Sequence, residues 1–141
     1  MAEATQFQRG KRIFHGSWCI PCFAMAGIAD GDFVTNFTPG FAGRIVKWYW
    51  IQGTPVTTAA KLSTLNLEIN AVNVNDGSGT NSTIALTSAA CTPLGKVIAG
   101  SIIGGANNFD KDDTVSVEAS STTAFLEGAG TIVIEYEGNV L

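Results

Sequence analysis

The segment Trp18-Cys19-Ile20-Pro21-Cys22 is the part of the sequence with the clearest capacity for chemistry. Two cysteines separated by two residues are typical of disulfide exchange, in which the first thiol is acidified at a helix N-terminus. That mechanism needs a long helix directly after the motif. Here the apolar residues that follow end at Asp30-Gly31-Asp32, a strong turn signal. We therefore expect Cys19 and Cys22 to lie in a strand, on opposite faces, as free thiols.

Metal binding and hydrolysis have less support. The three cysteines and the only histidine, His15, could formally supply four zinc ligands, but Cys91 stands alone, whereas zinc sites usually present two close pairs. The acidic residues of 110–113 lack the glycine and distal glutamate of an EF-hand calcium loop. A single histidine in the polar N-terminal part gives little basis for a Ser-His-Asp mechanism. The sequence predicts no catalytic, cofactor or metal site, and no enzyme.

Hydrophobic residues alternate with polar ones in several short segments. Residues 132–137, 114–119 and 65–70 each place apolar side chains on one face and polar side chains on the other. Such strands, separated by turn residues and not by amphipathic helices, predict an all-β, single antiparallel β-sandwich. We expect about eight strands, a typical number for a jelly roll. The first strand is predicted over residues 18–28.

Length and charge narrow the choice of function. The chain has 141 residues, 45% of them hydrophobic and 14% charged, which suits one globular domain. A net charge of -4 gives no electrostatic reason to bind nucleic acid. The uncharged stretch 13–29 is too short and too broken to span a membrane as a helix. We expect an extended N-terminal arm over residues 1–16 and a sandwich domain over residues 17–141.

An aromatic run, Trp48-Tyr49-Trp50, lies in a predicted strand over residues 44–51. Alternation would bury about half of such a run in any sandwich. We interpret Trp48, Tyr49 and Trp50 as core residues or as contacts in an oligomer. The alternative is an exposed platform on which sugar rings stack, which predicts Trp48 or Trp50 in a groove.

Three features of the sequence resemble the jelly-roll capsid decoration, or cement, proteins of tailed bacteriophages. The first is the Gly-Asp turn before a strand in Asp-Gly-Asp-Phe-Val-Thr-Asn-Phe, and the second is the Pro-Gly-Phe-Ala-Gly entry to the aromatic strand; both lie within residues 30–45. The third is the Asp-Thr-Val-Ser-Val strand within residues 109–119. The closing strand over 131–137 supports the likeness, which extends over roughly residues 28–137 and rests on pattern.

This resemblance implies a structural virion protein, made in the host cytoplasm and bound to the outer capsid surface. Its partner would be the major capsid protein, whose subunits it would bridge, and it would form a homo-oligomer, often a trimer. Arg9, Lys11 and Arg12 in the arm would contact acidic capsid surface. Nucleic acid, membrane and cofactors have no place in this function.

Other functions stay open at this stage. A carbohydrate-binding sandwich of a host-adhesion device would expose Trp48 or Trp50. A thioredoxin-class enzyme would have a helix after Cys22 and an acidic thiol. A capsid or shell subunit that assembles by itself is a third alternative.

Overall fold

The computed structural model describes residues 12–22 and 24–140, and these form an all-β structure. The described part contains ten strands and one 3-10 turn, and within it no helix is long and apolar enough to cross a membrane. The elements are β1 (Arg12–Cys22), η1 (Met25–Gly27), β2 (Gly31–Phe37), β3 (Gly43–Thr54), β4 (Leu62–Ile69), β5 (Val72–Asn73), β6 (Thr83–Thr87), β7 (Val97–Ala99), β8 (Asn108–Phe109), β9 (Val115–Thr123) and β10 (Ala129–Val140).

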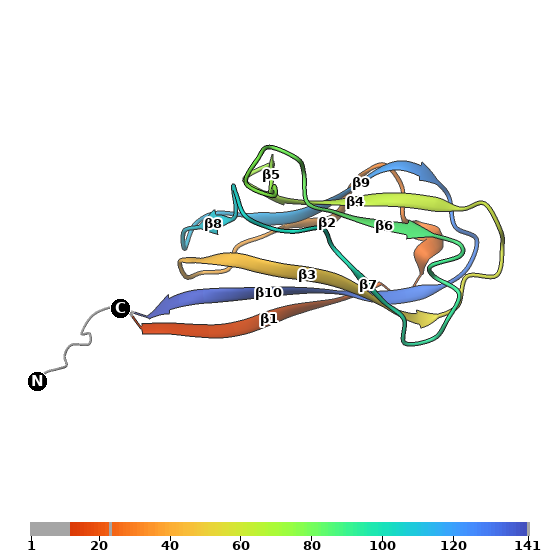
Figure 1. Cartoon of the computed structure of the whole chain (residues 1–141), viewed down its shortest axis with the longest axis horizontal. Helices are drawn as coiled ribbons and strands as arrows, with labels where there is room; N and C mark the ends of the chain where they lie inside the picture. Colours follow the sequence, from red (N-terminus) through yellow and green to blue (C-terminus); the bar gives the residue numbers. More distant parts are fainter. Residues whose placement is uncertain (1–11, 23, 141) are drawn as a thin grey trace, which may run out of the picture.

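The strands form two antiparallel sheets stacked as a sandwich (Figure 1). Sheet 1 has the order β1-β10-β3-β7, with β8 also pairing with β3. Sheet 2 has the order β2-β9-β4-β5, with β6 also pairing with β4. With the short β5 and β8 left out, consecutive strands alternate between the sheets except for β4 and β6, which pair with each other in sheet 2, and this is the strand order of a jelly roll. The predicted all-β sandwich of about eight strands is confirmed.

The period-two segments form central strands of both sheets. In β10, Ile132 and Ile134 are fully buried between the sheets, while Val133 and Glu135 lie on the outer face. The same alternation buries Leu65 and Leu67 of β4, as well as Val115, Val117 and Ala119 of β9. Side chains of both sheets therefore meet in one core, as expected for aligned sheets about 10 Å apart.

The first strand differs from its predicted position. It begins at Arg12, inside the expected arm, and ends at Cys22, well before residue 28. Phe14, Trp18 and Ile20 face inward, so the alternation begins earlier than the polar sequence indicates. Residues 24–30 instead contain the η1 turn, which buries Met25. Arg12 thus belongs to the sheet, and Arg9 and Lys11 lie outside the described residues.

An aromatic cluster closes one end of the sandwich between the sheets. The ring of Trp18 stacks on Tyr136 at 4.5 Å and meets Phe37 edge-on at 5.2 Å. Phe41 lies 5.6 Å from Phe109, and 5.2 Å from Tyr136, between ring centroids. The cluster joins β1, β2, β8 and β10, which are far apart in sequence.

The two core tryptophans have polar partners inside the sandwich. Trp48 donates from Nε1 to Ser82 Oγ at 2.9 Å, and Ser82 donates in turn to the Ser101 carbonyl at 2.8 Å. Trp50 donates to Gln52 Oε1 at 2.6 Å. Ser82 and Gln52 are both fully buried, so each indole N–H has a hydrogen-bond partner within the protein and needs no water.

Replacing Ser82 with Ala should lower the free energy of unfolding by about 1–3 kcal/mol, because the Trp48 N–H and the Ser101 carbonyl both lose a buried partner. Urea denaturation of wild type and variant measures this difference. The matched control is Ser17→Ala on an exposed position of β1, which should change stability by less than about 0.5 kcal/mol. Equal effects of the two substitutions would contradict the role given to Ser82.

Candidate interaction surface

The cysteine motif does not form a redox site in the described structure. Cys19 and Cys22 lie in β1, with Cys19 exposed on the outer face and Cys22 buried in the core. The element that follows is the three-residue η1 turn, where a thioredoxin-class enzyme requires a long helix. Burial raises the pKa of the Cys22 thiol, which is opposite to the acidification that disulfide exchange requires. The expectation of two free thiols on opposite faces is met.

The cysteines and the histidine do not converge on a metal. Cys91 is buried next to the loop after β3, where its backbone carbonyl accepts from Val56, while His15 and Cys19 lie on the outer face of β1. Among residues 12–22 and 24–140 no group of three His, Cys, Asp or Glu side chains is placed to hold a metal ion. In the 110–113 turn, Asp113 instead accepts from Asn70 Nδ2 and from the Asp110 amide, so it stabilises the turn itself.

The aromatic run divides between the core and the surface. Trp48 and Trp50 are 1% and 0% exposed, so neither lines a groove, and the sugar-platform expectation for them is wrong. Their alternation with Tyr49 leaves that ring on the outer face of sheet 1, where it is half-buried. Core positions for Trp48 and Trp50 are thus observed, and Tyr49 is available for contact.

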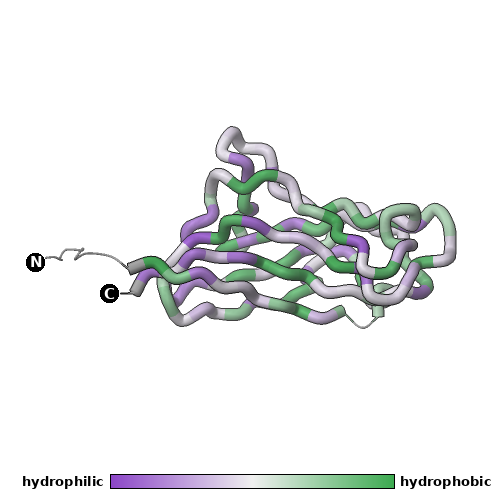
Figure 2. Tube along the Cα trace, turned by 60° about the horizontal axis from the view of Figure 1, so that its bottom comes forward, coloured by the Kyte–Doolittle hydropathy of each residue, from purple (hydrophilic) through white to green (hydrophobic). Residues whose placement is uncertain are grey.

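Most of the outer side chains of sheet 1 form four rows across the strands, because residues paired in an antiparallel sheet share one face, and a further outward pair, Ile13-Asn139, lies beyond them at the end of β1 and β10. We call this surface the sheet 1 face. Figure 2 looks toward this layer, and hydrophilic segments are most frequent near the end with the chain termini. Each row is written from β1 through β10 to β3 and then, where present, β8 or β7, and the rows are given in order starting at the end with the termini. They are His15-Glu137-Arg44-Asn108, Ser17-Glu135-Lys47, Cys19-Val133-Tyr49-Ala99 and Pro21-Thr131-Ile51-Val97.

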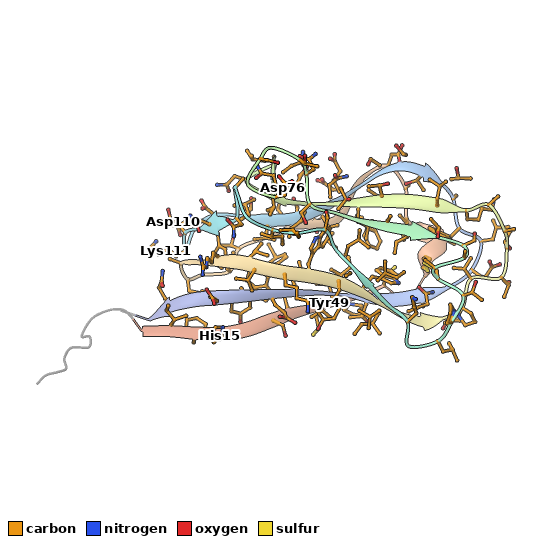
Figure 3. The ribbon with its side chains drawn as sticks, viewed as in Figure 1. His15, Tyr49, Asp76, Asp110 and Lys111 are labelled. Carbon is orange, nitrogen blue, oxygen red and sulfur yellow. The ribbon has the colours of Figure 1, made fainter. Side chains whose placement is uncertain are left out.

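The first two rows carry charges of both signs. Arg44 donates from Nε to Glu137 Oε1 at 2.8 Å, and His15 Nδ1 lies 3.7 Å from the other carboxylate oxygen of Glu137. Lys47 Nζ lies 5.5 Å from the centroid of the Tyr49 ring. Figure 3 shows His15 closer to the termini than Tyr49, along the same layer. The acids stand on β10 and the bases on β3, so opposite charges alternate between two adjacent strands.

The third and fourth rows are mostly apolar. Val133 is only 5% exposed although it lies on the outer face, because its neighbours on β1 and β3 flank it. Val97 at the far edge is 52% exposed, and Cys19 and Pro21 on β1 are exposed as well. Burial first, and then the Glu135 carboxylate, raise the pKa of Tyr49. The pairing of Tyr49 with Val133, next to the pair of Lys47 with Glu135, puts the tyrosine where the charged and apolar rows meet. An apolar area beside a charged one is typical of a protein-binding surface.

Sequence reasoning did not find the paired charges of this face. The alternation of residues 132–137 indicates that Glu135 and Glu137 share a face with Val133. That Lys47 and Arg44 stand beside them depends on the pairing of β10 with β3, which local sequence does not specify. A bulge at Val46 between the two pairs also shifts the register, so a simple alternation would misplace Arg44.

The outer face of sheet 2 has a different character. Asp32, Glu118 and Glu68 lie on the adjacent strands β2, β9 and β4. Glu68 is only 8% exposed and accepts from Ser116 Oγ at 3.3 Å. Burial first, then the neighbouring Glu118 and the more distant Asp32, raise the pKa of Glu68. These three charged side chains of the sheet 2 face are all acidic, whereas the sheet 1 face carries both acidic and basic side chains.

No family model and no curated protein matches this sequence. Among solved structures, one similar chain is described as the Cyanophage Pam1 capsid asymmetric unit, with 13% sequence identity and a TM-score of 0.40. The comparison covers 93% of this chain and 85% of that chain. A similarity at this level assigns neither a family nor a function.

Replacing Glu68 with Gln should stabilise the protein at neutral pH. A carboxyl whose pKa is raised on folding contributes stability below its unfolded pKa of about 4.3 and loses that contribution as the pH rises through the folded value. The variant should therefore exceed wild type in unfolding free energy at neutral pH, and the difference should shrink toward pH 4. Denaturation across this pH range measures it, with the exposed Asp112→Asn as control. A difference that does not depend on pH would contradict the assignment.

The thiols should react unequally in dilute, folded protein. Burial raises the pKa of Cys91 to about 11 and also raises that of Cys22, whereas Cys19 is exposed. We expect only Cys19 to react rapidly with an aromatic disulfide reagent, and the other two to react after unfolding. Cys19→Ser should abolish the rapid phase. If the wild type catalysed reduction of a protein disulfide and the double variant Cys19→Ser, Cys22→Ser did not, the redox interpretation would be restored.

Proposed function

We propose that the chain is a structural virion protein that binds the outer surface of a phage capsid and stabilises it by bridging major capsid protein subunits. The proposal includes a homo-oligomer, for which the sequence resemblance favours three copies, and location on the outer capsid surface. It includes no enzymatic step.

One observation carries this proposal: the separate segments that resemble decoration proteins are adjacent in the fold. Strand β2, from residues 30–45, pairs with β9, from residues 109–119, between Gly31 with Ala119 and Phe37 with Val115, with two register shifts along the way. Gly43, at the end of the Pro-Gly-Phe-Ala-Gly entry, pairs with Phe109, the first residue of the segment 109–119. The segments 30–45 and 109–119 therefore contact each other in both sheets, so the likeness describes parts of the fold that are in contact.

The close approach of β10 explains why a glycine stands at position 43, the end of this entry. A Cβ atom at position 43 would collide with the backbone of Glu137 and contact the ring of Phe109. Gly43 therefore permits β3 to enter sheet 1 against β10 while the loop before it carries Phe41 into the aromatic cluster. The motif thus builds the closed end of the jelly roll, and this supports a resemblance based on fold and not on catalytic chemistry.

The alternative functions have lost their specific support. A sugar-binding platform required Trp48 or Trp50 in a groove, and both are in the core. A thioredoxin-class enzyme required a helix after Cys22. A shell subunit that assembles by itself differs from a decoration protein in one respect, since it would form closed shells without a major capsid protein.

Residues 1–11 are proposed to contribute to capsid attachment, since they contain Arg9 and Lys11 against the single acid Glu3. Because Arg12 lies in β1, a deletion of residues 2–11 keeps every residue of the described strands. We expect the truncated protein to fold and form its oligomer but to occupy fewer capsid sites, with the larger deficit at low salt, where charge attraction is least screened.

Cosedimentation with empty shells of the major capsid protein, at two ionic strengths, measures this occupancy. The matched control exchanges Arg9→Lys and Lys11→Arg, which keeps the charge and should keep binding. Equal occupancy of the full-length and truncated proteins at both ionic strengths would remove residues 1–11 from the contact. Failure of the full-length protein to sediment with shells would refute the proposed function as a whole.

A further inference from the structure

We propose that two copies of the chain pair face to face through the sheet 1 face, about a two-fold axis that runs parallel to the strands between β10 and β3. This inference goes beyond the proposed function and holds whether or not the protein binds a capsid, and it gives an assembly of two copies in place of the three that the sequence resemblance favours. It rests on the order of charges in the rows, which makes this surface complementary to itself.

A two-fold rotation about this axis places β10 of one copy over β3 of the other and keeps each position along the strands. Glu135 then faces Lys47 of the second copy, and Glu137 faces its Arg44. By symmetry each pair occurs twice, so each of these four charged side chains faces a side chain of opposite charge on the second copy. Such pairing gives attraction across the interface and fixes its register.

The apolar rows meet under the same operation. Val133 lies over Tyr49 of the second copy, and Thr131 lies over its Ile51. The outer strands also correspond, because β1 comes to lie over β7 and brings Cys19 over Ala99. The exposed apolar side chains of one edge are thereby covered by those of the other edge, which removes apolar surface from water.

Other two-fold axes in the plane of the face give poor matches. An axis along β10 itself would place Glu135 over Glu135 and Glu137 over Glu137, which is repulsive. An axis along the rows would place the charged rows over the apolar rows and desolvate charges without partners. The proposed axis also keeps the strand directions of the two sheets aligned, which is the usual packing of one sheet on another.

The size of the face is sufficient for a specific but modest association. Strands about 4.8 Å apart and rows about 6.8 Å apart give roughly 500 Å² per copy, or about 1,000 Å² in total. This total is near the lower limit for specific interfaces, so the charge pairs should matter for the affinity. A foreign partner would need the same unusual order of charges, which the chain itself already provides.

Charge reversal in single copies and in mixtures tests the proposal. In Lys47→Glu, Glu135 of one copy would face a glutamate of the next, and in Glu135→Lys, Lys47 would face a lysine. Each variant alone should have half the molecular mass of the wild type by light scattering after gel filtration. An equimolar mixture should recover the wild-type mass, because every cross-copy pair again has opposite charges.

The mixture separates pairing between copies from effects within one copy. Lys47 and Glu135 are also neighbours in the same sheet, and mixing leaves that intramolecular cost unchanged in both variants. Lys111→Glu, on an exposed loop, is the charge-reversal control and should keep the wild-type mass. A wild-type mass of one or three copies, single variants with unchanged mass, or a mixture that stays at the lower mass would each overturn the proposal.

Discussion

Strand β10 pairs along both of its edges, with β1 on one side and β3 on the other, and the rest of the structure depends on this double pairing. Its inward residues, Ile132 and Ile134, fill the core between the sheets. Its outward residues, Glu135 and Glu137, stand beside the bases of β3. A one-residue slip in either pairing would exchange these two sets, so the hydrophobic core and the order of surface charges are fixed by the same register.

The two outer faces of the sandwich differ in what they can meet. The sheet 1 face has acids and bases on adjacent strands and an apolar half, so it can pair with its own copy. The acids Asp32, Glu118 and Glu68 on sheet 2 would repel a second copy of themselves. A protein with this polarity has one face suited to self-association, while residues 1–11, which have a net basic charge, are proposed above to contact the acidic surface of a capsid.

Part of this organisation could be predicted from sequence, and the rest depends on contacts that are distant along the chain. The segments 132–137, 114–119 and 65–70 coincide with parts of β10, β9 and β4, apart from Thr114 just before β9 and Asn70 just after β4, because alternation is a local signal. The start of β1 was missed, since Arg12, His15, Gly16 and Ser17 make the part of the strand before Trp18 mostly polar in sequence. Trp48 and Trp50 were assigned to a strand but not securely to the core. Their burial depends on Ser82 and Gln52, which satisfy the indole N–H groups. The charge pairs of the sheet 1 face required the β10–β3 register, which includes a bulge that no local pattern reveals.

An electron cryomicroscopy reconstruction tests the central claim, that this jelly roll is a decoration protein of a phage shell. The sample would be empty shells of a major capsid protein encoded in the same genome as the chain, incubated with the full-length protein. We expect sandwich-shaped density outside the shell, with the start of β1 on the side that faces the capsid. Density for residues 1–11 should continue from there onto capsid subunits. Shells without added density at saturating protein, or closed particles built from this chain alone, would contradict it.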